Sequence, residues 1–270
     1  MSTMTHEPSA SVRIWVALDE SPRSAAALTA AAELASELDA ELAGLFVEDV
    51  NLQHLIGFPF AREFSVLTGE ARPLSQGEVE RTWRREAENL QSLLAGAADR
   101  LRLRWSFRVT RGKVTAEVST LAQALDLIVL GRRTGVSVRA VARTSAQFTT
   151  VHPKVGPVMV LFEDRSASSH SLDLAAKLAR RNGAELVLLI RADNEKSYQS
   201  ACAVAQAALK ERGTRARCTR LTALDGASLI QAARREAAGC LVLADRDRFL
   251  SHAGFERMLD EMDCPIVLTR

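Results

Sequence analysis

The feature that most constrains the fold of this chain is an internal repeat. Residues 13–49 and 158–193 share one order: an apolar run, a loop with an acid and a serine, an alanine- and leucine-rich segment, and A-E-L opening a second apolar run. Residues 126–131 also match 239–244. Within the two longer segments the match keeps a constant offset of 144, which pairs Leu28, Leu34, Ala40 and Leu42 with Leu172, Leu178, Ala184 and Leu186. A period this long indicates a duplicated unit that organises the whole chain.

Each copy alternates strands with helices. Ser21 is a good N-cap and Pro22 fits the first helical position, so a helix is expected to begin there. Asn182–Gly183 predicts a left-handed end for the equivalent helix of the second copy. The predicted strands are continuous apolar runs, which is typical of strands covered by helices on both faces. We therefore predict an α/β fold of two doubly wound, mostly parallel, Rossmann-like domains.

The number of strands raises a question about the border between the copies. A five-stranded unit repeated twice needs ten strands, but nine are predicted, near residues 13–18, 42–47, 103–110, 126–131, 157–163, 184–190, 215–221, 239–244 and 265–269. We assign the strand at 157–163 to the second copy, because a loop and helix matching 19–38 follow it. The first copy then needs another segment to complete its edge. The predicted domains are 1–155 and 156–270, the second being a degenerate copy of the first.

Residues 50–80 have no counterpart in the second copy. Their glycines and prolines predict an irregular insertion, after which residues 81–101 resume a helix. Phe58, Phe60 and Phe64 indicate that the insertion packs on something, either on its own domain or as a lid or partner surface.

Residues 102–109 alternate apolar and polar side chains, unlike the other strands. This pattern predicts an edge strand with one apolar face. That face consists of Leu103, Trp105, Phe107 and Val109.

Composition excludes several classes of protein. The 270 residues are 47% hydrophobic, which is ample for a packed core, and a net charge of +2 gives no footprint for nucleic acid. The first eleven residues have no apolar signal segment, and the apolar runs are too short to span a bilayer. We therefore expect a cytoplasmic protein with no membrane or nucleic-acid partner.

No pattern of metal ligation or catalysis stands out. The four cysteines are never spaced C-x-x-C and are expected to be reduced core thiols: Cys202, Cys218, Cys240 and Cys264. The histidines lack ligand spacing, and D-R-D at 245–247 follows a late strand, so we interpret it as a surface loop. Neither a Walker motif nor a G-x-S-x-G motif occurs. We expect no metal and no enzyme activity.

Four stretches together point to a family. V-A-L-D-E-S-P at 16–22, V-T-R-G-K at 109–113, D-L-I-V-L-G at 126–131 and C-P-I-V-L-T-R at 264–270 resemble the universal stress protein family, here as a tandem two-domain member. The resemblance covers nearly the whole chain apart from 50–80. It implies universal stress protein domains and, as in some members, adenine nucleotide bound by a G-x2-G-x9-G-[ST] loop after the fourth strand.

The loop that matches this pattern keeps only part of it. Gly131 and Ser145 are retained, but Thr134 and Thr144 replace two glycines. β-branched residues resist positive φ and obstruct the backbone N–H groups that would hold a phosphate. Each such strained position would cost about 1–3 kcal/mol. The backbone route to nucleotide binding is therefore weakened or lost.

Side chains offer another route to an anion. Guanidinium groups bind phosphate well. The loop contains Arg132, Arg133, Arg139 and Arg143 and no acid. The resemblance places Asp19 near the adenosine and the backbone of Val47, at the end of the second strand, against adenine; Asp19 could equally cap its own turn. Glu163 lies opposite Asp19 in the second copy, whose later loop lacks the glycines, so we expect no nucleotide site there.

Two functions of different classes remain open. The first is a stress-response regulatory or interaction protein with weak or lost nucleotide binding and no catalysis. It would dock a protein partner or a second copy, as a homodimer, through a sheet edge or residues 50–80. The alternative is a regulatory protein that binds ATP or AMP in the loop 131–145. The threonines favour the first, while the arginines and Ser145 keep the second open.

Overall fold

The chain is described by a computed structural model that covers two strand-and-helix units, the first unit within 12–131 and the second unit within 156–269. The described residues are 12–19, 21–49, 62–64, 71–73, 76–113, 116–117, 120, 127–131, 156–163, 166–210, 213–244, 248–249 and 254–269. The first unit contains β1 (Arg13–Leu18), α1 (Pro22–Glu37), β2 (Glu41–Asp49), β3 (Arg62–Phe64), β4 (Ala71–Pro73), α3 (Gln76–Leu101), β5 (Trp105–Gly112) and β6 (Leu127–Leu130). The second contains β7 (Val158–Phe162), α5 (Ser166–Arg181), β8 (Leu186–Arg191), α6 (Glu195–Lys210), β9 (Ala216–Leu221), α7 (Gly226–Arg235), β10 (Cys240–Leu243), α9 (Phe255–Glu261) and β11 (Ile266–Leu268).

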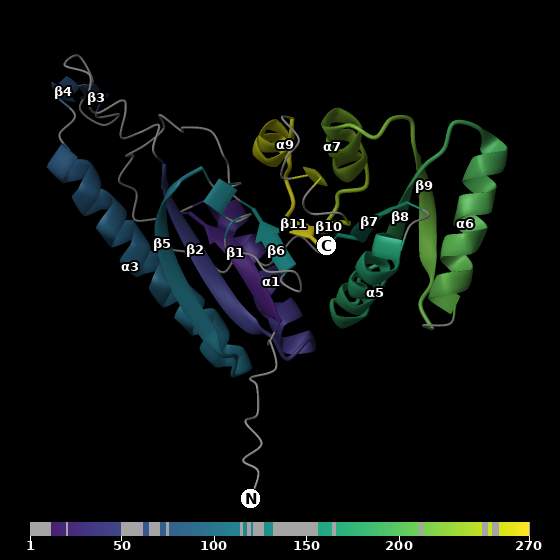
Figure 1. The fold of residues 1–270 in the computed structure, drawn as a ribbon, viewed down its shortest axis with the longest axis horizontal. Helices are drawn as coiled ribbons and strands as arrows, with labels where there is room; N and C mark the ends of the chain where they lie inside the picture. Colours follow the sequence, from purple (N-terminus) through teal and green to yellow (C-terminus); the bar gives the residue numbers. More distant parts are fainter. Residues whose placement is uncertain are drawn as a thin grey trace, which may run out of the picture.

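One continuous sheet joins the two units. Among the described residues its nine strands follow the order β5-β2-β1-β6-β11-β10-β7-β8-β9 (Figure 1). All neighbouring strands are parallel except β6 and β11, which are antiparallel. In each unit the first strand lies between the second and the fourth, so the predicted doubly wound, mostly parallel α/β fold is confirmed.

The missing strand of the first unit is supplied by the end of the chain. β7 pairs with β8 and β10, so the assignment of this strand to the second unit is confirmed. β11 lies between β6 of the first unit and β10 of the second, antiparallel to β6 and parallel to β10. Val267 is opposite Val242 on one side and Val129 on the other. The last strand therefore completes both units at once.

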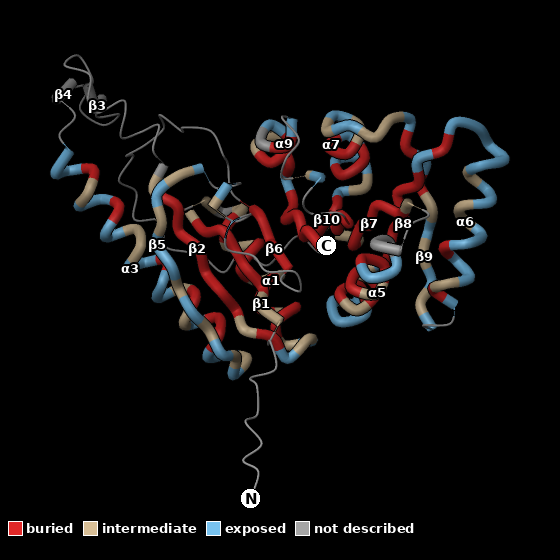
Figure 2. Tube along the Cα trace, in the orientation of Figure 1, coloured by how far each residue is buried: buried red, intermediate tan, exposed pale blue. Residues whose placement is uncertain are grey.

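The sheet separates two hydrophobic cores. Alternate residues of β1 enter opposite cores: Ile14 and Val16 belong to the core that contains α1, α3, α5 and α6, whereas Trp15 and Ala17 belong to the core that contains α7 and α9. All four side chains are at most 4% exposed. Figure 2 shows the same burial along the central strands. Burial on both faces explains why the strands are continuous apolar runs.

The first helix of each unit has the predicted ends. Ser21 is the N-cap of α1, and its side chain accepts a hydrogen bond from the Ser24 N–H at 3.2 Å, while Pro22 occupies the first helical position. After α1 comes Asp39 at φ 48°, and after α5 comes Gly183 at φ 60°. These two residues are equivalent at the offset of 144. The left-handed turn predicted at Gly183 is thus confirmed and recurs in the first unit.

The insertion is more regular than the sequence suggested. Residues 62–64 and 71–73 pair as an antiparallel hairpin, and α3 begins at Gln76 rather than near residue 81. The prediction of irregular structure throughout 50–80 was therefore wrong for these segments. Gln76 Nε2 donates to Glu80 Oε1 at 3.0 Å, a contact one turn apart that supports the first turn of the helix. Phe58 and Phe60 lie outside the described residues, as does the Phe64 side chain.

Strand β5 is an edge strand, as predicted, but its apolar face ends early. Trp105 and Phe107 are half-buried against the core that contains α3. Val109, the last residue of the predicted apolar face, is 45% exposed, so this face is not covered at its end. At that end of the strand Thr110 is half-buried instead, and its hydroxyl donates to Glu117 Oε2 at 2.7 Å. An edge strand has one neighbour only, so its outer side chains lose cover at the strand end.

Arginine side chains form hydrogen bonds across the boundary between the two units. Arg23 of α1 donates to the Asp260 carbonyl oxygen at 2.7 Å and to Asp263 Oδ1 at 3.0 Å. Arg234 of α7 donates to Asp263 Oδ2 at 3.3 Å and to the Glu261 carbonyl oxygen at 2.9 Å. The Asp263 carboxylate thus accepts from both units immediately before β11. Charge-assisted hydrogen bonds of this kind position β11 beside β6.

Helices α1 and α5 meet at the same joint. Arg181 Nη1 lies 3.6 Å from Glu37 Oε2, and the Glu33 side chain hydrogen-bonds Asn182. Burial at this contact raises the pKa of Glu33 above its ordinary value of 4.5, against smaller opposing effects of Asn182 and Arg181. Because the folded pKa is the higher one, the stability from Glu33 is present below the ordinary pKa and is lost as pH rises through the folded value.

Replacing Glu33 by glutamine should remove this loss. The amide keeps the shape and the hydrogen bond to Asn182 but has no charge to desolvate. We expect Glu33→Gln to be more stable than wild type at neutral pH by up to about 1 kcal/mol, with the gap closing in acid. Thermal unfolding followed between about pH 4 and pH 8 measures it. Glu88→Gln, on the exposed side of α3, is the control; a gap that stays constant with pH would contradict the assignment.

Candidate functional site

The sequence places its candidate residues at the carboxyl edge of the parallel strands. In the first unit β1 ends at Leu18 and β6 ends at Leu130, and the two strands are hydrogen-bonded neighbours with Ala17 opposite Leu130. Asp19 and Gly131 follow them directly, so the fold brings these two predicted residues to one edge. β1 and β6 are parallel, but the chain leaves them toward opposite sides of the sheet, and such a switch point is the usual ligand position in doubly wound sheets.

Asp19 has a structural role at this edge. Its Oδ1 accepts from the Ser21 N–H at 2.9 Å, and its own N–H donates to Ser24 Oγ at 2.9 Å. These hydrogen bonds fold the turn between β1 and α1 into the helix N-cap. The alternative role weighed from the sequence, capping the following turn, is therefore present.

Gly131 is also explained by packing. A Cβ atom built on Gly131 would lie 2.4 Å from the Arg23 carbonyl oxygen and 2.7 Å from the Ala27 Cβ. Both distances are well inside contact range, and the oxygen belongs to the helix backbone. The closeness of α1 alone therefore requires glycine here, whether or not a phosphate ever binds.

Val47 is not at the end of its strand. β2 continues to Asp49, and Val47 pairs within the strand with Thr110 of β5. Its side chain is 1% exposed and belongs to the core with α7 and α9. The predicted strand end at Val47 was wrong by two residues, because pairing with β5 continues as far as Gly112.

The remaining predicted residues lie outside the described part of the chain. The structure gives no position for Arg132, Arg133, Thr134, Thr144 and Ser145. Their proposed contacts with phosphate therefore stay predictions.

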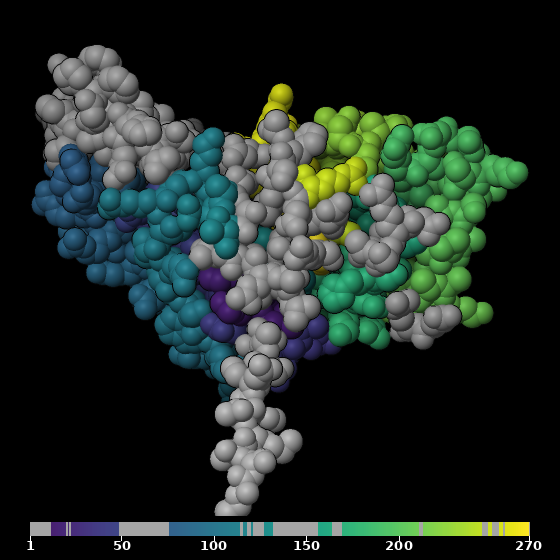
Figure 3. All heavy atoms as spheres, in the orientation of Figure 1, coloured from purple at the N-terminus to yellow at the C-terminus, as the bar shows by residue number. Residues whose placement is uncertain are grey.

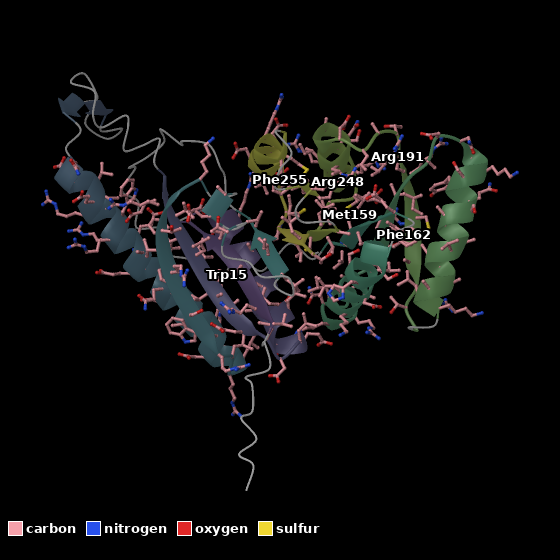
Figure 4. The ribbon with its side chains drawn as sticks, viewed as in Figure 1. Trp15, Met159, Phe162, Arg191, Arg248 and Phe255 are labelled. Carbon is pink, nitrogen blue, oxygen red and sulfur yellow. The ribbon has the colours of Figure 1, made fainter. Side chains whose placement is uncertain are left out.

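The second unit has an ion pair at the equivalent edge. Glu163 follows β7, Arg248 follows β10, and the Arg248 Nη1 atom lies 3.0 Å and 3.3 Å from the two Glu163 carboxylate oxygens. The guanidinium also stacks 5.8 Å from the centre of the Phe249 ring, which lies 6.2 Å from the Phe255 ring. Figure 4 shows Arg248 above β7 and near Phe255. This pair connects the first-strand loop to the fourth-strand loop.

Other charges at this edge are also compensated. Arg191 at the end of β8 lies 3.4 Å from Asp193, and Arg220 at the end of β9 donates to the Ala192 carbonyl oxygen at 3.1 Å. Sequence reasoning noted Glu163 but missed Arg248, because the pair joins segments far apart in the chain. The sequence did carry a signal: after β10, where the family pattern has a glycine-rich loop, residues 245–248 read D-R-D-R, with arginines next to acids.

The described segments assemble no cluster of metal-ligating side chains. Across them no group of three or more histidine, cysteine, aspartate or glutamate side chains is placed to hold a metal. Within the same segments, each helix is too short or too polar to cross a membrane.

These observations define a class of protein: a doubly wound α/β protein in which two units share one sheet and each presents a switch point at its carboxyl edge. A scan against protein-family models finds no match, and no curated protein matches in sequence. Solved structures do match. A universal stress protein from Archaeoglobus fulgidus DSM 4304 has TM-score 0.55 at 10% identity, covering 97% of this chain and 99% of that chain.

Two further structures are similar over different lengths. A putative universal stress protein from Pseudomonas aeruginosa UCBPP-PA14 has TM-score 0.46 at 11% identity, covering 96% of this chain and 93% of that one. The Archaeoglobus fulgidus universal stress protein in complex with dAMP has TM-score 0.36 at 13% identity, covering 43% and 98%. Of these three, the full-length match above 0.5 assigns the fold. The chain has the universal stress protein fold, as the resemblance implied.

Proposed function

We propose that this chain is a regulatory protein of the universal stress type that acts through protein contacts, without catalysis and with weak or lost nucleotide binding. The observation that supports this most directly is the Glu163–Arg248 ion pair. It joins the two loops between which a switch-point ligand would lie, and Glu163 has 21% of its side chain exposed. A nucleotide entering there would have to break the pair and leave a half-buried carboxylate beside its phosphates.

In the first unit, weak or lost nucleotide binding is supported by the structural roles of two predicted site residues. Asp19 caps its own turn and Gly131 admits helix α1, so neither residue requires a nucleotide to explain its presence. Among the described strands β5 and β9 form the two edges of the sheet. We add to them the insertion 50–80, which the sequence suggested as a partner surface. These are the places where a protein partner or a second copy would dock in this proposal.

The alternative function, adenine nucleotide binding in the first unit, has one observation in its favour. The fold brings Asp19 and Gly131 to a single edge, and the loop beginning at Arg132 starts from that point. ATP or AMP held by arginine side chains would fit this location.

Thermal unfolding with and without nucleotide separates the two functions. A ligand at one hundred times its Kd stabilises a protein by about 2.7 kcal/mol. Our proposal expects no shift with millimolar ATP or AMP, either in wild type or in Glu163→Ala, in which the second switch point loses its ion pair. A shift would support the alternative, and Arg132→Ala and Arg133→Ala should then abolish it while Thr134→Gly increases it. A shift seen only in Glu163→Ala would place a latent site in the second unit.

A further inference from the structure

Two thiols lie side by side at the outer rim of the second unit. Tyr198, Cys202 and Gln206 repeat every fourth residue along α6 and so share one face of that helix. Cys218 is on β9, beneath this face, and Gln206 Nε2 lies 3.9 Å from its Sγ atom. The side chains of Cys202, Cys218 and Tyr198 all pack against the same hydrophobic core, where α6 covers β9.

These two thiols are reachable from solvent, unlike the other pair of cysteines. Cys202 and Cys218 are free, half-buried thiols that pack against the core without being enclosed by it. Cys240 and Cys264 are 6% and 7% exposed near the middle of the sheet, where the expectation of core thiols holds. β9 is the outermost strand and α6 the outermost helix on that side of the molecule (Figures 1 and 3). An oxidant in water therefore meets Cys202 and Cys218 first.

The contact between them can contract to a bond. A disulfide needs its sulfur atoms about 2.05 Å apart, so two neighbouring free thiols must move closer together to form one. Helix α6 buries only Ala205 and Leu209 completely among its described residues, which leaves it a lightly anchored outer helix. Forming the bond therefore requires α6 to move toward β9.

We propose that Cys202 and Cys218 form a reversible intramolecular disulfide when the chain meets hydrogen peroxide. The Cys202 sulfur attacks one peroxide oxygen, the O–O bond breaks, and a sulfenic acid and one water form. The Cys218 sulfur then attacks the Cys202 sulfur, the S–O bond breaks, and a second water leaves as the S–S bond forms. Two thiols are oxidised and one peroxide is reduced to two waters.

The order of these steps follows from the surroundings of the two sulfurs. Burial and the neighbouring thiol raise the pKa of Cys218 to about 12, which keeps it protonated at neutral pH. Because the thiolate is the nucleophile, Cys218 is poorly suited to the first attack, so we assign the first step to Cys202 and the resolving step to Cys218. The resulting bond would fasten α6 to an open edge of the sheet, one of the proposed contact surfaces.

Peptide mapping of the intact chain tests the proposal. After peroxide treatment, alkylation and tryptic digestion without reduction, we expect peptide 197–210, which contains Cys202, linked to peptide 218–220, which contains Cys218. Two thiols per chain should be lost and recovered with dithiothreitol. Peptides 236–246 and 258–270, with the two buried cysteines, should stay unlinked and are the internal control.

Matched variants complete the test. Cys202→Ser and Cys218→Ser should each abolish the linked peptide, while Cys240→Ala should leave it intact. Unchanged thermal unfolding of the reduced serine variants shows that they still fold. The proposal is overturned if both peptides stay alkylated after peroxide, if Cys202 proceeds to sulfinic acid without linkage, or if the linkage joins two chains on a non-reducing gel.

Discussion

Val267→Asp is expected to unfold the whole chain, not the second unit alone. Val267 is 0% exposed at the centre of β11, with Val242 on one side and Val129 on the other. An uncompensated charge buried there costs about 3–5 kcal/mol or more. The total stability of a domain is about 5–15 kcal/mol. Urea unfolding should therefore show a large loss of stability or no folded state at all.

The chain contains separate probes for its two units. All three tryptophans, at positions 15, 83 and 105, lie in the first unit, whereas the buried Cys240 thiol reports on the second. Because β11 completes both units, tryptophan fluorescence and thiol labelling should give the same transition in wild type. In Val267→Asp both signals should move together toward lower urea.

A surface aspartate provides the control for this substitution. Val204 is 47% exposed on α6, so Val204→Asp should change stability by less than about 0.5 kcal/mol. A variant in which Cys240 becomes reactive while the tryptophan transition stays in place would show that the first unit folds without β11, against the expectation.

The strands were predictable because each carries its signal locally. The nine predicted strands, seven of them continuous apolar runs, correspond to the nine strands of the sheet to within a few residues. Continuous apolar composition reflects burial on both faces, and the offset of 144 aligned β1 with β7. The helix ends were also local, since Ser21 and Gly183 act within one turn of the backbone.

The partner of β6 could not be predicted in the same way. Leu130, in the middle of the chain, pairs with Ile266, near its C-terminus. No local sequence pattern specifies this antiparallel pairing. The hairpin at 62–64 and 71–73 was missed because its strands are only three residues long, too short for periodicity to register.

The candidate site shows a different limit. Sequence position was enough to bring Asp19 and Gly131 to one edge, but residue type was ambiguous about their roles. Aspartate and glycine serve a ligand site, and they equally serve a helix cap and a close helix approach. Arg248 was missed because its partner, Glu163, is reached only through the fold.

Gly131→Ala distinguishes packing from ligand binding at the most suggestive of these positions. The added methyl would meet the Arg23 carbonyl oxygen at 2.4 Å, and a helix backbone cannot yield as a side-chain end can. We expect a loss of about 1–3 kcal/mol without any nucleotide present. Gly96→Ala is the matched control, because nothing lies within 4 Å of its added carbon and it sits inside α3. It should gain about 0.5–1 kcal/mol from helix propensity.

The same pair of variants bears on why the glycine is retained. If Gly131 is retained for its contact with α1, Gly131→Ala loses stability in buffer, and adding ATP changes neither the variant nor wild type. If it is retained for a phosphate, the variant keeps its unfolding midpoint in buffer and loses only the stabilisation that ATP gives to wild type. The 2.4 Å approach makes the first outcome the expected one, since a clash with the helix is felt in every folded molecule, whether or not it has met a ligand.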